Sequence, residues 1–264
     1  MLGDMVLGVI GGSGQLGCAI IQGLVAAKAV PASQILISNR SGVRSDLPDA
    51  VRLVADLDEM VASCDVILLS IPPANASKLR MKTDGKPVLS VMAGVTLQQL
   101  TEIAGHNRVI RAMSSPAAAG RLAYTPYMLG NGAQDDDALA EGLFGSVGKT
   151  ERLNEEAQLD VFTAITGPVP GFVALFADAM VRFAKDQGVD RDVAVRAVRQ
   201  LFLAAGHEMG DNGVSPAQQV QEMIDYAGTT AAGLEAMKAA GIEGVVAEGL
   251  LAAVEKAQRI SKVT

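Results

Sequence analysis

Short apolar runs alternate with longer stretches of helical periodicity in the first half of the chain. The runs are rich in aliphatic and β-branched residues, which is typical of strands buried on both faces of a parallel sheet. We expect strands at residues 6–10, 34–38, 51–54, 65–71, 87–92, 108–113 and 127–130, and helices at 18–25, 57–63, 97–104 and 138–144. This alternation predicts an α/β fold with a doubly wound parallel sheet.

The pattern changes near residue 150. Strand-like runs end, and from residue 158 onward Ala-rich amphipathic segments follow one another. We expect helices at 172–187, 192–209, 231–240 and 244–261, and a short helix opened by Ser215 and Pro216. The chain is therefore expected to form two domains, an α/β domain over residues 1–156 and an all-helical domain over 157–264.

A glycine cluster directly follows the first expected strand. Gly12, Gly14 and Gly17 form a Gly-x-Gly-x-x-Gly pattern between that strand and a helix. Glycines let the backbone turn tightly and approach a pyrophosphate, whose charge is favourable at the free N–H groups of a helix N-terminus. The pattern predicts a dinucleotide site. The alternative is a tight strand-to-helix turn that binds nothing.

The end of the second expected strand indicates which dinucleotide is bound. An NAD site requires a carboxylate about 20 residues after the glycines, whereas a 2′-phosphate requires an arginine and hydroxyl groups. Asn39, Arg40 and Ser41 occupy this position. A guanidinium can bind phosphate oxygens in a fork, so these residues favour NADPH over NADH. The alternative is a solvated turn with an ordinary surface arginine.

The fourth expected strand also ends at a candidate ligand position. Pro72 and Pro73 cannot continue a central ladder, so the strand stops there. Open α/β sheets bind ligands outside the carboxyl ends of their strands. Ile71 and Pro72 are therefore expected to lie against the cofactor.

Composition and charge narrow the class of protein. Hydrophobic residues make up 49% of the 264 residues, and the net charge of −7 disfavours a nucleic-acid partner. No apolar stretch reaches the ~20 residues of a membrane span, and the N-terminus lacks the basic start of a signal peptide.

With only two cysteines, Cys18 and Cys64, a cytoplasmic location is expected. His106 and His207 are isolated, so we expect no metal site.

Further motifs are spread along the chain. They are Ala93-Gly94-Val95, Arg111-Ala112-Met113, the segment TAITGPVPGFV at residues 163–173, and the segment GTTAAGL at residues 228–234. Together with the glycine loop and Asn39-Arg40-Ser41, they resemble the pyrroline-5-carboxylate reductase family over nearly the whole chain. The resemblance implies a Rossmann domain followed by a helical dimerisation domain interlocked between two subunits. It also implies hydride transfer from NAD(P)H to a cyclic imine, which gives proline in the parent enzyme.

The resemblance assigns roles to individual residues. It places Gly12, Ser13, Gly14, Gln15 and Leu16 around the pyrophosphate, Asn39, Arg40 and Ser41 at the adenosine ribose phosphate, and Ile71, Pro72, Ala93 and Gly94 beside the nicotinamide. Gly228, Thr229 and Thr230 match the end of the family's substrate loop, which holds the substrate carboxylate. Thr230 is the candidate catalytic residue, since its hydroxyl can orient the imine nitrogen without titrating. The alternative is that Thr229 or Thr230 only caps the next helix.

Two departures from the family pattern concern the substrate and the cofactor loop. Asp225-Tyr226-Ala227 replaces Ser-Pro-Gly in the substrate loop. If Asp225 faced a substrate carboxylate, two charges ~4 Å apart would repel by roughly 4 kcal/mol at an effective dielectric of ~20. The glycine loop also carries an extra residue and is similar to the loop of deazaflavin-dependent NADP reductases.

These observations leave several hypotheses open. The first is an NADPH-dependent reductase that acts on pyrroline-5-carboxylate or a close analogue. The second is the same scaffold with a less anionic imine or related substrate, bound with help from Asp225. The third is a non-catalytic NADPH-binding dimer, and deazaflavin-linked hydride transfer is a further alternative. The family resemblance also implies a homodimer, or a larger homo-oligomer built from dimers, and helices this rich in Ala and Gly can pack closely.

Overall fold

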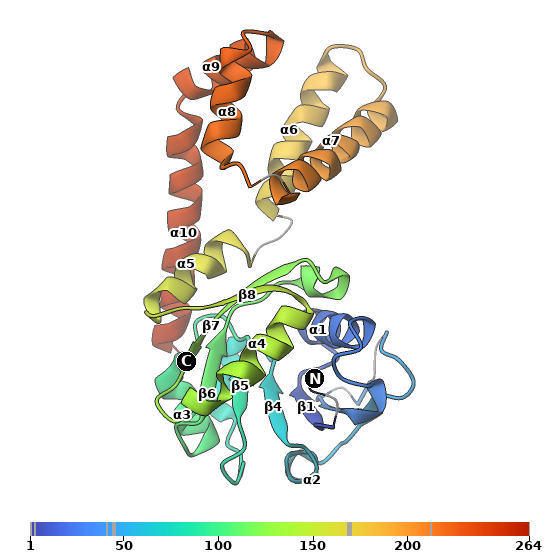
Figure 1. Cartoon of the computed structure of the whole chain (residues 1–264), viewed down its shortest axis with the longest axis vertical. Helices are drawn as coiled ribbons and strands as arrows, with labels where there is room; N and C mark the ends of the chain where they lie inside the picture. Colours follow the sequence, from blue (N-terminus) through green and yellow to red (C-terminus); the bar gives the residue numbers. More distant parts are fainter. Residues whose placement is uncertain are drawn as a thin grey trace. The chain divides into compact units, whose positions relative to one another are not determined.

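The computed structural model describes residues 2, 4–40, 42–43, 46–167, 171–211 and 213–263 (Figure 1). It divides into two compact units, of which the first comprises Met1–Val169 and Leu251–Thr264 and the second Pro170–Leu250. The chain from 2 to 263, as far as it is described, contains no helix long and apolar enough to cross a membrane.

The first unit contains one eight-stranded sheet in the order β3-β2-β1-β4-β5-β6-β7-β8. The strands are β1 (Leu7–Ile10), β2 (Ile35–Ser38), β3 (Arg52–Leu53), β4 (Val66–Leu69), β5 (Val88–Ser90), β6 (Val109–Ala112), β7 (Ala123–Leu129) and β8 (Gly148–Arg152). Strands β1 to β6 pair in parallel, which confirms the doubly wound sheet expected from the sequence.

The last two strands differ from the expectation. β7 pairs with β6 antiparallel, and β8 pairs with β7 in parallel. The connection from β6 to β7 contains only a short 3₁₀ helix, η3 (Pro116–Gly120), whereas a parallel crossover needs about a dozen residues or more. β8 was not expected at all, because its sequence Gly-Lys-Thr-Glu-Arg carries no apolar run.

Helices cover both faces of this sheet. The buried residues of α1 (Gln15–Ala26) and α4 (Asp137–Ser146) pack with Leu7 and Val9 on one face. Those of α2 (Leu57–Ala62) and α3 (Leu97–Ala104) pack with Ile10 and Ile67 on the other. Successive residues of β1 thus enter opposite core layers, as strand geometry requires.

The remaining helices are close to the expected ranges. They are α5 (Ala157–Ile165), α6 (Gly171–Asp186), α7 (Arg191–Asp211), α8 (Pro216–Asp225), α9 (Thr229–Ala239) and α10 (Ile242–Val263). The compact units do not follow the expected domain limits of 1–156 and 157–264, because α5 and the end of α10 belong to the unit that contains the sheet. The division at residues 156 and 157 concerns the two domains implied by the family resemblance, and it stays a prediction.

Candidate functional site

Three strand ends are tied together where the order of strands reverses. The Gly11 N–H donates to the Ser38 carbonyl oxygen after β2 (2.8 Å), and the Ser70 N–H after β4 donates to the Ile10 carbonyl oxygen (2.8 Å). Gly11 has a φ of +84°, and an added Cβ would collide with the Ser70 carbonyl oxygen. This junction is the topological switch point at which open α/β sheets bind ligands.

The glycine loop is packed tightly between this junction and α1. A Cβ at Gly12 would lie 2.5 Å from the Ile37 side chain, and one at Gly17 would lie 2.6 Å from the Gly11 carbonyl oxygen. Gly14 is the N-cap of α1 and has no side chain to cap it, and the first turn contains no acidic residue. The N-terminus of α1 therefore offers free N–H donors and a favourable dipole for an anion.

The loop after β2 is held against the glycine loop by side chains. The Asn39 Nδ2 donates to the Ser13 Oγ (2.6 Å), and that hydroxyl donates to the Val43 carbonyl oxygen (2.6 Å). The Gly42 N–H donates to the Asn39 Oδ1 (2.8 Å). Arg40 is exposed in this turn, and no described residue forms an ion pair with it. Ser41, the third residue expected here, lies outside the described residues.

The residues expected beside the nicotinamide follow β4 and β5. Ile71 is half-buried and Pro72 is exposed at the start of η2 (Pro73–Lys78). Gly94 is buried with a φ of +73°, and its Cβ would lie 2.9 Å from the Ala257 carbonyl oxygen and 3.0 Å from the Ile260 Cγ2. The end of α10 thus packs directly on the loop that contains Ala93 and Gly94.

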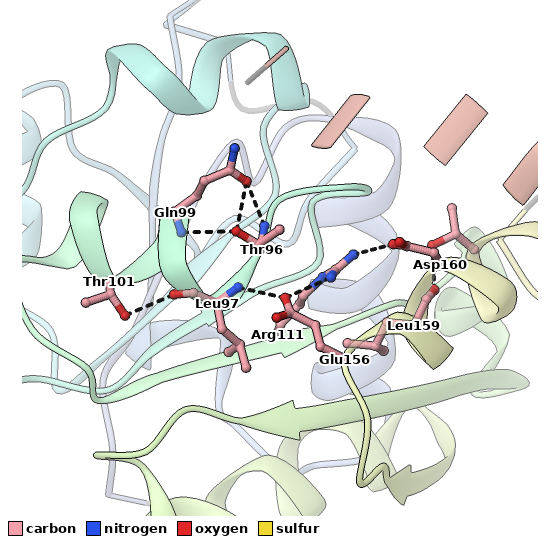
Figure 2. Close-up of polar contacts among 9 residues, drawn as sticks. Thr96, Leu97, Gln99, Thr101, Arg111, Glu156, Leu159 and Asp160 are labelled. Atoms are coloured by element: carbon pink, nitrogen blue, oxygen red, sulfur yellow. Dashed lines mark hydrogen bonds and ion pairs between the residues drawn. The ribbon is translucent and has the colours of Figure 1, made fainter. Parts of the chain in front are cut away.

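The N-terminus of α3 follows this loop and is closed by side chains. Thr96 is the N-cap, and its hydroxyl accepts from the Gln99 N–H while the Gln99 side chain accepts from the Thr96 N–H. The next amide, that of Leu97, donates to the Glu156 Oε1 (2.8 Å). Figure 2 shows Glu156 between Leu97 and Arg111, with these contacts drawn as dashed lines.

Arg111 completes this group with two ion pairs. Its Nη1 lies 2.8 Å from the Glu156 Oε1, and its Nη2 lies 2.6 Å from the Asp160 Oδ1 (Figure 2). The Arg111 side chain is only 4% exposed, so its charge is desolvated and needs these partners. We call Arg111, Glu156 and Asp160 the Arg111 cluster.

Sequence reasoning did not identify the Arg111 cluster. Arg111 was noted only as part of a motif, although an arginine inside a buried strand requires a buried acceptor. Glu156 and Asp160 are four residues apart at the start of α5, which places them on one face of the helix. This spacing of four residues could have indicated that the two carboxylates act together, but it does not indicate which cation they bind.

The expected substrate residues lie in the second unit, where α8 ends and α9 begins. The Asp225 Oδ1 accepts a hydrogen bond from the Gln221 Nε2 on the same helix (2.8 Å), and Tyr226 is 85% exposed. Ala227 has a φ of +56°. Gly228 is the N-cap of α9, so neither Thr229 nor Thr230 occupies the capping position that the alternative expected.

The structure therefore forms two groups of the expected site residues. In the first unit, Gly12, Ser13, Gly14, Gln15, Leu16, Asn39 and Arg40 gather around the start of α1, while Ile71, Pro72, Ala93 and Gly94 follow the neighbouring strands β4 and β5. In the second unit, Gly228, Thr229 and Thr230 form the open start of α9, with Asp225 at the end of α8.

The two cysteine thiols and the acidic and histidine side chains are the remaining candidate nucleophiles and metal ligands. Burial raises the pKa of the Cys18 and Cys64 thiols, so both are protonated at neutral pH. Within the described ranges, no three His, Cys, Asp or Glu side chains are arranged to hold a metal ion. Neither thiol has the lowered pKa of a reactive cysteine.

Comparison with known proteins covers both halves of the chain. Residues 156–260 match the domain family "Pyrroline-5-carboxylate reductase dimerisation", and residues 6–94 match "NADP oxidoreductase coenzyme F420-dependent". The pyrroline-5-carboxylate reductase of Pisum sativum is 28% identical over 263 residues, which is 97% of this chain and 96% of the relative.

Solved structures agree over the full length. The 1-pyrroline-5-carboxylate reductase of Streptococcus pyogenes is 26% identical with a TM-score of 0.82, covering 98% of this chain and all (100%) of the other. The Plasmodium falciparum enzyme with NADP bound is 19% identical, with a TM-score of 0.82 and 98% coverage of both chains. A reductive aminase from Aspergillus terreus, in complex with NADPH, has a TM-score of 0.56 at 19% identity and 98% coverage of both chains.

The two matched domain families occur in the order expected from the sequence, and the strand order and the helical C-terminal region agree with them. Identities below 30% and the altered Asp225-Tyr226-Ala227 loop mark the sequence as distant from the curated relatives. The chain is therefore similar to pyrroline-5-carboxylate reductases over nearly its whole length, and its residues 156–260 match their dimerisation domain family.

Proposed function

We propose that the protein reduces a cyclic imine with NADPH, and that the imine is pyrroline-5-carboxylate or a close analogue. One observation carries the proposal. The two helix starts that the family uses for anions, those of α1 and α9, have glycine N-caps and no side-chain cap. By contrast, α2, α3 and α8 are capped by the side chains of Asp56, Thr96 and Ser215. Two further helix starts, those of α4 and α5, also lack a side-chain cap, but their N-cap residues are the acidic Asp136 and Glu156, which disfavour an anion.

The first unit fits a dinucleotide. The start of α1 supplies N–H donors for a pyrophosphate without a nearby acidic residue. Arg40 projects from a turn that Asn39 and Ser13 hold in place, so its guanidinium is available for a 2′-phosphate. This arrangement supports NADPH as the cofactor, in line with the NADP-bound relative.

The start of α9 fits the substrate. The amides of Thr229, Thr230 and Ala231 open the helix, and they offer donors to a substrate carboxylate. When bound, the reduced nicotinamide supplies a hydride to the imine carbon. We assign to the Thr230 hydroxyl a hydrogen bond to the imine nitrogen, which orients the C=N bond, and the nitrogen takes its proton from water.

Asp225 favours a second candidate substrate, an imine with less negative charge or with an amine. Its carboxylate is exposed and accepts a hydrogen bond only from Gln221 among the described residues. A carboxylate this close to the start of α9 would weaken the binding of an anion and strengthen that of a cation. The two candidates share the cofactor and the reaction and differ in the charge of the substrate.

Turnover measurements separate these candidates. We expect the purified protein to oxidise NADPH in the presence of pyrroline-5-carboxylate. If only neutral or amine-bearing cyclic imines are reduced, the second candidate holds. Tight NADPH binding without reduction of any imine in the panel would contradict both and support a non-catalytic NADPH-binding protein.

We also propose that the helical unit forms the homodimer. Phe172, Leu175 and Phe183 of α6 are 44%, 70% and 68% exposed, and α6 has no buried residue. An apolar face left exposed in this way is expected to pack against another chain. Light scattering at micromolar concentration should give at least twice the mass of one chain, and a monomer would contradict the proposal.

A further inference from the structure

We infer that Glu156 is a positioning residue that fixes the start of α3, and with it the loop expected beside the nicotinamide. This inference rests on the proposed function. The Arg111 cluster and the Leu97 amide bonded to it bring together three parts of the chain that are distant in sequence. Arg111 is at the carboxyl end of β6, Glu156 and Asp160 are at the start of α5, and Leu97 opens α3.

Burial makes the geometry of this group specific. The Arg111 side chain is 4% exposed and that of Asp160 is 12% exposed. Two charged groups with so little water around them are stable only when their hydrogen bonds are well aligned. Asp160 therefore fixes one side of the Arg111 guanidinium, and the guanidinium in turn fixes the Glu156 carboxylate.

The same Glu156 oxygen then holds the backbone of α3. Its Oε1 accepts from the Arg111 Nη1 (2.8 Å) and from the Leu97 N–H (2.8 Å), as Figure 2 shows. The Leu97 amide is one of the donors that a helix start leaves free. The capping box of Thr96 and Gln99 bonds the neighbouring amides, and Glu156 adds a long-range partner, 59 residues away in sequence, to this helix start.

The position of this helix start gives the contact its functional meaning. The loop of residues 91–96 connects β5 to α3 at the carboxyl edge of the sheet. Dinucleotide folds bind one mononucleotide at each half of such a sheet, and β4 to β6 form the second half here. Gly94 in this loop already packs on Ala257, so a displacement at Leu97 would move a loop that has little room to adjust.

A second arginine ion pair at the opposite end of β6 provides a matched control. Arg108 precedes β6, and its Nε and Nη2 each lie 2.7 Å from one Asp136 carboxylate oxygen. Asp136 is 5% exposed. This pair also joins distant segments, but it lies at the amino edge of the sheet, away from the strand ends that bind ligands.

The decisive experiment compares Leu97→Pro with Leu97→Ala. Both variants lose the leucine side chain, but only proline removes the N–H that donates to Glu156. Proline is favoured at the first helical position, and Thr96 has the extended backbone (φ −79°, ψ 162°) that precedes proline well. The Arg111 ion pairs stay intact in both variants, so no buried charge loses its partner.

We expect the kcat of Leu97→Pro with NADPH and pyrroline-5-carboxylate to be about tenfold to a hundredfold below that of Leu97→Ala. The two KM values should differ between these variants by about threefold or less, because the anion-binding helix starts are elsewhere. Glu156→Gln keeps an acceptor for the Leu97 N–H and should retain most of the activity, whereas Glu156→Ala should lose it. Asp136→Asn should lower the melting temperature without lowering kcat.

A binding readout separates this inference from the proposed function. The fluorescence of bound NADPH reports the environment of the nicotinamide, and we expect Leu97→Pro to change it relative to Leu97→Ala at equal NADPH affinity. Equal fluorescence and equal kcat in the two variants would overturn the positioning role. If the wild type reduces no imine, the proposed function fails, and the fluorescence comparison still decides the role of Glu156.

Discussion

Helices α3 and α9 begin in opposite ways. The first turn of α3 is closed by the Thr96–Gln99 capping box and by Glu156, whereas α9 begins at Gly228 with no side-chain cap. A closed helix start satisfies its own amides and stabilises the fold, while an open one leaves donors for a ligand. Among the helices with a described N-cap, only α1 and α9 begin at a glycine with neither a capping side chain nor an acidic N-cap residue, which is why we propose these two starts as the anion sites.

The largest expected effect comes from closing the start of α9. Gly228→Asp supplies a capping carboxylate, and the backbone at this position (φ −96°) accepts a side chain, with the nearest atom 3.4 Å from an added Cβ. Repulsion of up to roughly 4 kcal/mol should raise the KM for pyrroline-5-carboxylate by up to about a thousandfold. Gly228→Asn has the same size without the charge and should raise KM much less. Equal KM values in the two variants would contradict an anion site at α9.

A substitution at Arg40 tests whether the turn beside the start of α1 binds the 2′-phosphate of NADPH. Arg40→Ala should raise the KM for NADPH by about tenfold to a hundredfold, because charged hydrogen bonds to a phosphate contribute about 1.5–3 kcal/mol. The KM for NADH, which lacks the 2′-phosphate, should hardly change. A parallel rise for both cofactors would show that Arg40 supports the loop rather than the phosphate.

Thr230 tests whether a hydroxyl at the start of α9 acts in the reaction. Thr230→Val removes the hydroxyl at similar size and should lower kcat by about tenfold or more, while Thr230→Ser should restore much of it. Since Thr230 caps no helix here, the melting temperature should stay close to that of the wild type. Thr229→Val is the matched neighbour, and an equal loss of kcat there would contradict a specific role for Thr230.

Opening the start of α3 should have a smaller effect, and on stability. Thr96→Ala removes the capping hydroxyl that accepts from the Gln99 N–H. The free energy of unfolding should fall by about 1 kcal/mol in urea titrations. The KM values should be unchanged, because Glu156 still holds Leu97. A large change in the KM for NADPH would mean that this helix start contacts the cofactor.

The smallest expected effect concerns His106, which follows the other end of α3. Its Nδ1 accepts from the Arg108 N–H (3.1 Å) and its Nε2 lies 2.6 Å from the Thr83 hydroxyl. Burial, and then the charge of Arg108, lowers the pKa of His106 below 6.5. The native state therefore binds fewer protons than the unfolded state, and stability should fall as the pH drops below about 6.5.

Urea titrations between pH 7.5 and pH 5 (chosen conditions, about one unit or more on each side of the ordinary histidine pKa) check this effect. His106→Gln cannot be protonated, so its stability should depend less on pH than that of the wild type. The same pH dependence in both proteins would assign it to other groups.

Local sequence patterns predicted much of the fold. The range of α3 was predicted to the residue, because Thr96 and Gln99 form a capping box and Gly105 ends the helix in a left-handed conformation. The first six strands were predicted from their apolar runs. β8 was missed because it is polar, and the reversal at β7 was missed because strand direction is not encoded in an apolar run.

For the candidate site, the sequence predicted which residues take part but not the contacts between them. The glycine loop and the turn at Asn39 and Arg40 were identified from spacing, and the structure brings them together through the Asn39–Ser13 hydrogen bond. That bond joins residues 26 positions apart, and no local pattern indicates it. Whether Ser13 and Asn39 contact the cofactor, as the sequence suggests, stays a prediction.

The sequence by itself determined the alternation of strands and helices and the glycine loop, because each depends on residues a few positions apart. Only the tertiary structure decided the partners of Arg111 and Leu97. Glu156 is 45 residues from Arg111 and 59 from Leu97, and Asp160 is 49 residues from Arg111. A buried charge must find an acceptor, but the path of the whole chain decides which one lies within reach.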